Sequence, residues 1–247
     1  MEMTRREALT ALATGASAVF INARGVAMVG EESGAGATSG VRVAPGTHRL
    51  ASLPFDPKTL KGLSEKLIVS HHENNYGGAL KNLNKIEEEL AAVTKETPGF
   101  VISGLKEREL SFTNSVILHE LYFGNLGGDG RATDPLQNAL GDAFGGFGRW
   151  EELFRATGSS LAGGSGWTIL NFNFHTGDLR TYWSGNHTQS LSFGDPLLVM
   201  DMYEHAYQMD FGAAAGKYID AFFANIQWDM VNRRYERALE AWKAIRS

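Results

Sequence analysis

The chain has 247 residues, a formal net charge of −5 at pH 7 and no cysteine. A chain of this length can bury a sizeable core in one large domain or two small ones, and its mild negative charge, without a basic block, argues against nucleic-acid binding. The lack of thiolates argues against a structural zinc site and against iron–sulfur clusters.

The N-terminus has the layout of a secretory signal. Arg5 and Arg6 precede an apolar, Ala/Gly-rich run from Leu9 to Ile21, which is a charged n-region followed by an h-region. The paired arginines resemble the twin-arginine type. We therefore expect export to the periplasm or the cell exterior, with no stable membrane association after processing. The alternatives are an uncleaved anchor and a disordered extension; the sequence does not fix a cleavage site.

The segment Glu31–Gly46 is rich in Gly, Ser, Ala and Thr and predicts a flexible linker, so that 1–46 is export signal and linker. From Asp56 to about Thr94 leucines recur at helical spacing, which predicts a helix. Pro98-Gly99 breaks the chain, and a second helix is expected from about Ser111 to Leu126. Two helices with a short connection predict an antiparallel hairpin.

The glycine-rich run 127–130 predicts a boundary between a helical hairpin domain, 47–130, and a C-terminal domain, 131–247. Helical patterns follow the boundary near 134–154 and recur from His205 to about Leu239. Between them, alternating apolar and polar residues predict three strands, at 167–174, 179–183 and 196–200. This order predicts an α+β fold: an N-terminal antiparallel helical hairpin, then a C-terminal domain with a small three-stranded antiparallel sheet and helices.

Asp201 and His205 are four residues apart. On a helix this spacing brings both side chains to one face, where both can reach one metal ion. A histidine with a carboxylate suits iron, manganese or zinc, although such a pair also occurs as an ordinary hydrogen-bonded surface pair. His71 and His119 lie in apolar or amphipathic surroundings. Each is either a satisfied core histidine or a buried neutral imidazole, the form that a metal needs, and the four residues together form a plausible redox-metal set.

Several short motifs follow one another along the chain in a definite order. They are Leu53-Pro54-Phe55 with Leu60, the interval from His71 to Asn84, His119 with Tyr122-Phe123, Gly164-Ser165-Gly166-Trp167, and Asp201-Met202-Tyr203-Glu204-His205-Ala206-Tyr207. In this order and spacing the chain resembles the iron/manganese superoxide dismutases from about Leu53 to Ala241. Each motif is weak alone, and the specificity lies in the set.

The resemblance implies one Fe or Mn ion per subunit, bound by His71, His119, Asp201 and His205, with a solvent molecule as fifth ligand. Superoxide would be the substrate, converted to dioxygen and hydrogen peroxide. The sequence does not choose between iron and manganese, because availability often decides which metal is bound.

The resemblance also assigns residues around the metal. His187 stands where the family usually has a Gln that hydrogen-bonds the metal-bound solvent. Ser115, at the other position from which the family can present a Gln, is small enough to leave room for it. Trp167 and Tyr203, together with Phe123, would exclude bulk water. The subunit would form a homodimer, with Glu204 at the interface reaching the partner's metal-binding histidine.

The chain departs from the family at three places. Ala79 stands at the gateway Tyr, and Asn75 at a second active-site His. Gln208 stands at the Tyr that this His contacts across the dimer, and two amides can still hydrogen-bond each other. These departures leave a metal-binding protein of the same fold, with weak or lost turnover, as the alternative. A non-haem iron oxygenase needs only two histidines and one carboxylate, and the further ligand His119 argues against it.

Overall fold

The computed structural model describes residues 44–247. The predicted export signal and most of the predicted linker fall on residues 1–43 and lie outside the described part of the chain. No helix within 44–247 is long and apolar enough to cross a membrane. These residues belong to one contact unit, Arg42–Ser247, and the predicted domain boundary at 130 stays a prediction.

The first predicted helix is divided into shorter pieces. Asp56 accepts a hydrogen bond from the Lys58 amide and caps only the 3-10 turn Pro57–Thr59. Gly62, at a φ of 76° that favours glycine, then turns the chain. The Ser64 hydroxyl accepts from the Leu67 amide at 3.1 Å and caps the helix that follows. The helical pieces after this turn are α2 (Glu65–Ser70), the π-helical stretch η2 (His71–Tyr76) and α3 (Gly77–Ala91).

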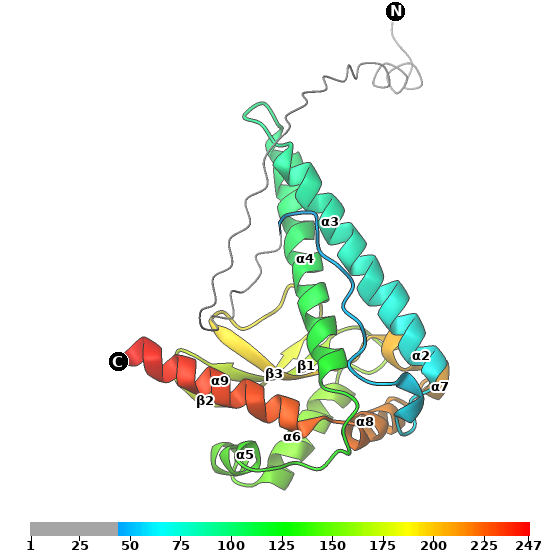
Figure 1. Cartoon of the computed structure of the whole chain (residues 1–247), viewed down its shortest axis with the longest axis vertical. Helices are drawn as coiled ribbons and strands as arrows, with labels where there is room; N and C mark the ends of the chain where they lie inside the picture. The colour runs from blue at the N-terminus through cyan, green and yellow to red at the C-terminus, as the bar shows by residue number, and fades with distance from the viewer. Residues whose placement is uncertain (1–43) are drawn as a thin grey trace, which may run out of the picture. The chain divides into compact units, whose positions relative to one another are not determined.

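Helix α4 spans Gly99–Gly124 and is longer than the predicted helix at 111–126. It starts directly after Pro98, and only Leu105 is buried within its first eleven residues, 99–109. Because few side chains in this part of the helix are buried, its apolar periodicity is weak. This explains why the sequence did not predict the first turns of α4. Helices α3 and α4 run side by side and form the predicted hairpin (Figure 1).

The C-terminal part confirms the predicted sheet. Strands β1 (Trp167–Asn173), β2 (Asp178–Ser184) and β3 (Gly194–Asp201) are antiparallel and lie in the order β2-β1-β3. Helices α5 (Leu136–Phe144) and α6 (Phe147–Ser159) precede the sheet. The predicted helix from His205 to Leu239 is wrong as a single element, because the chain turns at Gly212 and at residues 225–227. It consists of η3 (Glu204–Ala206), α7 (Gln208–Phe211), α8 (Ala215–Ala224) and α9 (Trp228–Arg246).

The register of the sheet decides which residues meet at its edge. Trp167, the first residue of β1, pairs with Ser184 at the end of β2 and with Asp201 at the end of β3. Strand β1 is buried along almost its whole length, and α4 packs on β3 (Figure 1). The residues at this end of the sheet are therefore held against α4.

A buried arginine fixes α4, β3 and α9 to one another. Arg234 donates from Nη1 to Asn125 Oδ1 at 2.5 Å and to the Leu197 carbonyl at 2.9 Å. Asn125 in turn donates to the Val199 carbonyl at 2.6 Å. Burial lowers the pKa of Arg234 to about 10, so the guanidinium stays charged at neutral pH.

We expect Arg234→Leu to lower the free energy of unfolding by about 2–4 kcal/mol, because it leaves two buried acceptors, Asn125 Oδ1 and the Leu197 carbonyl, without their hydrogen-bond donor. Urea unfolding of the metal-free protein measures this loss. Arg233→Leu is the matched control, because Arg233 is exposed and its one side-chain hydrogen bond among residues 44–247 is to the Met230 sulfur, at 3.9 Å. Equal losses in the two variants would contradict a special role for Arg234.

Candidate metal centre

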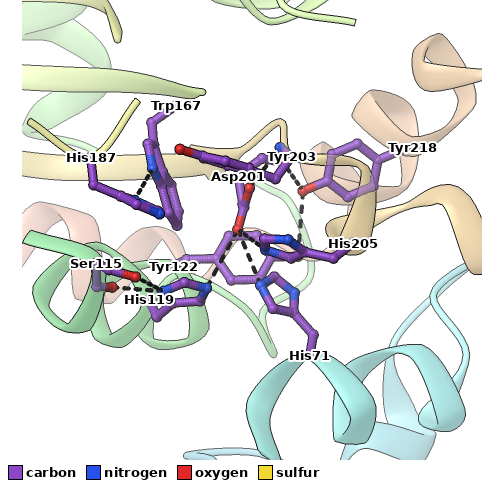
Figure 2. Close-up of polar contacts among 10 residues, drawn as sticks. All are labelled: His71, Ser115, His119, Tyr122, Trp167, His187, Asp201, Tyr203, His205 and Tyr218. Atoms are coloured by element: carbon purple, nitrogen blue, oxygen red, sulfur yellow. Dashed lines mark hydrogen bonds and ion pairs between the residues drawn. The ribbon is translucent and has the colours of Figure 1, made fainter. Parts of the chain in front are cut away.

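The structure brings the four predicted ligands together. One ligand atom from each of His71, His119, Asp201 and His205 lies within 4.8 Å of all the others. They come from four separate elements: η2, α4, the end of β3 and η3 (Figure 2). Three of the four residues are buried and His205 is partly exposed. That these residues bind a metal stays a prediction.

Asp201 and His205 approach each other by a different backbone arrangement from the predicted one. The two residues do not share a helix, because Asp201 ends β3 and His205 lies in the 3-10 turn that follows. Asp201 Oδ1 accepts from the Tyr203 amide at 2.8 Å, which holds the start of the turn. Oδ2 of the same carboxylate faces His205 Nε2 at 3.2 Å. One carboxylate therefore both shapes the turn and faces the cluster.

Asp201 Oδ2 is the central atom of the cluster. It lies 3.1 Å from His71 Nε2 and 3.7 Å from His119 Nε2, in addition to its contact with His205. Burial by itself would raise the pKa of Asp201, but the charge and hydrogen bonds of His205 and His71 hold that pKa below its ordinary value. The carboxylate is therefore ionised at neutral pH, as a metal ligand must be.

The two buried histidines are held in their neutral forms. Burial lowers the pKa of His71. Burial is the main cause that lowers the pKa of His119 to about 3, and the electrostatic effect of the neighbouring His71 contributes to this shift. Neutral imidazoles are the form that ligates a metal ion.

The tautomer of His119 gives a direct test of whether a metal fits. His119 Nδ1 lies 2.6 Å from the Ser115 carbonyl, so this nitrogen carries the hydrogen and donates it. In the neutral ring Nε2 then carries a lone pair. This buried nitrogen has no hydrogen-bond partner within residues 44–247, and the Asp201 carboxylate faces it at 3.7 Å. A lone pair facing an anion across a buried gap is unfavourable unless a cation lies between them, so the donor set fits a metal ion.

His187 stands beside this cluster (Figure 2). The Trp167 indole donates to His187 Nδ1 at 3.0 Å. Because an indole nitrogen can only donate, Nδ1 must be the acceptor, and a neutral His187 carries its hydrogen on Nε2. Burial lowers the pKa of His187, which favours this neutral form. The Tyr203 ring stacks on it, with centroids 4.9 Å apart and planes 11° apart.

A cavity of about 250 Å³ adjoins the cluster. It is lined by His119, His187, His205, Ser115, Phe112, Gly78, Ala79, Asn74, Asn75 and Asn82. Asn74 and Asn82 are exposed, so the cavity reaches the surface. Two of the three family departures, Asn75 and Ala79, lie on its wall. The third, Gln208, is exposed on α7 and does not line the cavity, and its pairing with Asn75 across a dimer stays a prediction.

Other aromatic residues complete the surroundings of the cluster. Phe123 and Tyr122 each place their ring centroid 5.1 Å from that of His71. The Tyr218 hydroxyl donates to the Asp201 carbonyl at 2.6 Å. Sequence reasoning gave no role to Tyr122 or Tyr218. For Tyr218 no local signal existed, because it contacts the backbone of a residue in a different element.

Sequence similarity relates the chain to a known protein family. Residues 132–234 match the family model of the iron/manganese superoxide dismutases, C-terminal domain. Superoxide dismutase [Fe] of Cupriavidus metallidurans is 46% identical over 193 residues, which are 78% of this chain and 98% of that relative. Superoxide dismutase [Fe] of Aquifex pyrophilus is 35% identical over 213 residues, 81% of this chain and 98% of the relative.

The relatives are not all named for the same metal. Superoxide dismutase [Mn] 1 of Halobacterium salinarum is 30% identical over 202 residues, 79% of this chain and 98% of the relative. Similarity at this level, across nearly the whole length of each relative, settles the family but not the metal. The chain belongs to the iron/manganese superoxide dismutase family.

Proposed function

We propose that this protein is a superoxide dismutase that converts superoxide to dioxygen and hydrogen peroxide at one Fe or Mn ion, held by His71, His119, Asp201 and His205. The names of the relatives support the reaction. The observation that carries the metal site is the buried His119 Nε2, which faces the Asp201 carboxylate at 3.7 Å and has no hydrogen-bond partner among residues 44–247.

A bound Fe or Mn ion supplies one-electron redox chemistry, so that one superoxide is oxidised to dioxygen and a second is reduced to hydrogen peroxide with two protons. The protein would supply three imidazoles and one carboxylate, and the negative charge of the carboxylate would offset part of the charge of the cation. With a metal ion bound, His187 would donate from Nε2 toward solvent at that ion, because the Trp167 indole occupies its Nδ1.

The cavity of about 250 Å³ is the proposed entry for the substrate. A diatomic anion fits there, and the amides of Asn75 and Asn82 can donate hydrogen bonds to it. Among the described residues that line the cavity there is no carboxyl, phenol or ammonium group. We therefore assign delivery of the two protons to solvent in the cavity, since no phenol stands at Ala79.

The test is an assay of superoxide dismutation on purified protein loaded separately with iron and with manganese. The proposal expects about one metal ion per chain and dismutation far above that of the metal-free protein. The metal that supports turnover then identifies the cofactor. One full equivalent of metal with no dismutation in either preparation would favour the alternative, a metal-binding protein of the same fold that has lost turnover.

We further propose that the subunits form a homodimer through the face that carries Glu204. Its side chain is exposed and lies next to His205 in η3. Sedimentation of the metal-loaded protein measures the assembly state, and Glu204→Gln is expected to weaken the dimer. A monomer at micromolar concentration would contradict this proposal while leaving the chemistry of the metal site untouched.

Export is proposed from the twin-arginine-type pattern at Arg5 and Arg6. Changing both residues to lysine should block transfer out of the cytoplasm, because a twin-arginine signal requires the arginine pair itself. Cell fractionation measures the outcome, and Arg24→Lys, beyond the apolar run, is the matched control. Unchanged arrival outside the cytoplasm would mean that another signal operates or that the arginines are incidental.

A further inference from the structure

His187 is carried by a segment without regular secondary structure. Loop 185–193 joins β2 to β3. Its internal hydrogen bonds give it a defined shape: the Gly185 amide donates to Gln189 Oε1 at 2.7 Å, and Ser184 Oγ lies 2.6 Å from the carbonyl oxygens of both Asn186 and Gln189. These bonds do not fix the loop relative to α4, the helix that carries the ligand His119.

One hydrogen bond ties this loop to α4. Asn114 Nδ2 donates to the His187 carbonyl at 2.6 Å. Among the hydrogen bonds of residues 44–247, it is the only one between loop 185–193 and α4. Asn114 precedes Ser115, whose carbonyl accepts from His119 Nδ1. Two neighbouring residues of one helix therefore hold the ligand His119 and the backbone of His187.

The contact between the loop and α4 is thinly packed around this bond. A cavity of about 180 Å³ is lined by Asn114, Ile117 and Leu118 of α4 and by Ser190 and Leu191 of the loop. The cavity of about 250 Å³ beside the metal cluster touches His187 itself. Where cavities adjoin a contact, few van der Waals contacts fix its spacing. The hydrogen bond of Asn114 therefore carries much of the positioning.

We propose that Asn114 is a positioning residue for dismutation: its amide holds loop 185–193 on α4 so that the Nε2–H of His187 meets the solvent bound at the metal. Three contacts then divide the task. The Trp167 indole selects the tautomer, the Tyr203 ring sets the plane of the imidazole, and Asn114 sets the position of the backbone. This inference rests on the proposed function.

The first test compares Asn114→Ala and Asn114→Asp with the wild type. Each removes the donor, and Asp also places carboxylate oxygens against the His187 carbonyl. Metal content should stay at one equivalent, because no ligand is changed. Dismutation should fall about two- to tenfold, the range that one neutral hydrogen bond supports. The midpoint potential should shift in the same direction as in His187→Ala. Asn114→Gln, which keeps an amide donor, should recover part of both.

Thr113→Ala is the control for a general disturbance of α4, because the Thr113 side chain makes no hydrogen bond among the described residues. A second readout needs no metal. In metal-free wild-type protein, long-range ¹H–¹⁵N spectra should show His187 as a single Nε2–H tautomer. In Asn114→Ala the same signals should broaden or split. If the wild-type protein does not dismutate superoxide, the proposed function fails. The spectra of the metal-free protein decide in either case whether Asn114 holds His187.

The decisive experiment is a double-mutant cycle. If Asn114 acts through His187, then Asn114→Ala should cost nothing further in a His187→Ala background. An equal loss in both backgrounds would overturn the proposal, since Asn114 would then act elsewhere. Unchanged rate, potential and spectra in Asn114→Ala would overturn it as well. If Asn114→Ala does not fold, the comparison of Asn114→Asp with Asn114→Gln decides. Equal dismutation rates and equal midpoint potentials in these two variants would contradict a role for the amide donor.

Discussion

His119→Ala is expected to abolish stoichiometric binding of iron or manganese. The substitution removes a buried nitrogen whose lone pair faces the Asp201 carboxylate and which has no hydrogen-bond partner within residues 44–247. Three protein ligands would remain, and the cavity beside His119 would admit solvent in its place. A redox ion held by fewer protein ligands is lost during purification, and dismutation is lost with it. Elemental analysis of purified protein, expressed as metal per chain, measures this result.

His72→Gln is the matched control. His72 is a buried histidine next to the predicted ligand His71, but its Nε2 lies 2.7 Å from the Ala51 carbonyl and is engaged there. Glutamine keeps a donor for that carbonyl, so the metal content should remain at one equivalent. Asp201→Ala should behave as His119→Ala does. An undiminished equivalent of metal in either of these two variants would remove that residue from the set of ligands.

The sequence predicted the sheet well and the helices less well. The strands were placed within about two residues of their bounds, because alternation and turn residues are local signals. Helix α4 was predicted too short, since its first turns bury little besides Leu105. The π-helical stretch at His71–Tyr76 was not predicted at all. Such stretches are rare, frequent at functional sites and without a sequence signal of their own.

The candidate site shows the same division between local and distant information. The sequence singled out four residues whose ligand atoms do meet within 4.8 Å. It gave the wrong local reason for Asp201 and His205, because a spacing of four residues suits a strand followed by a tight turn as well as a helix. The sequence did not predict the contacts between separate helices and strands. The bonds from Asn114 to His187 and from Tyr218 to Asp201 depend on how α4, α8 and the sheet pack.

His187→Ala is expected to leave the metal in place and slow the chemistry. The four predicted ligands are unchanged, so metal content should stay near one equivalent. Solvent bound at the metal would lose its hydrogen bond from Nε2, and a hydrogen bond to a charged group is worth about 1.5–3 kcal/mol. If most of this appears as a shifted redox potential or a higher barrier, dismutation should fall about ten- to a hundredfold, since about 1.4 kcal/mol is a factor of ten.

Two polar neighbours of His187, Ser115 and Tyr203, are poorly placed to replace this donor. Ser115 lines the same cavity, but its hydroxyl lies 3.4 Å from His119 Nδ1, the ring nitrogen that points away from the cluster. Tyr203 presents its ring face to His187, with the two planes only 11° apart. His187→Gln should therefore recover part of the rate, because an amide can donate the same hydrogen bond. His175→Ala, at an exposed turn of the sheet, is the control and should change neither rate nor metal content.

The two readouts together separate a tuning residue from a merely structural one. If His187 had only a structural role, His187→Ala would lower the metal content and the thermal stability along with the rate. His187→Gln would then not restore the rate on its own. A tuning role changes the rate and the optical spectrum of the bound metal while its stoichiometry holds. Normal dismutation with an unshifted spectrum in His187→Ala would show that this residue is only a loop histidine, and the hydrogen bond to bound solvent would have to come from another residue of the cavity.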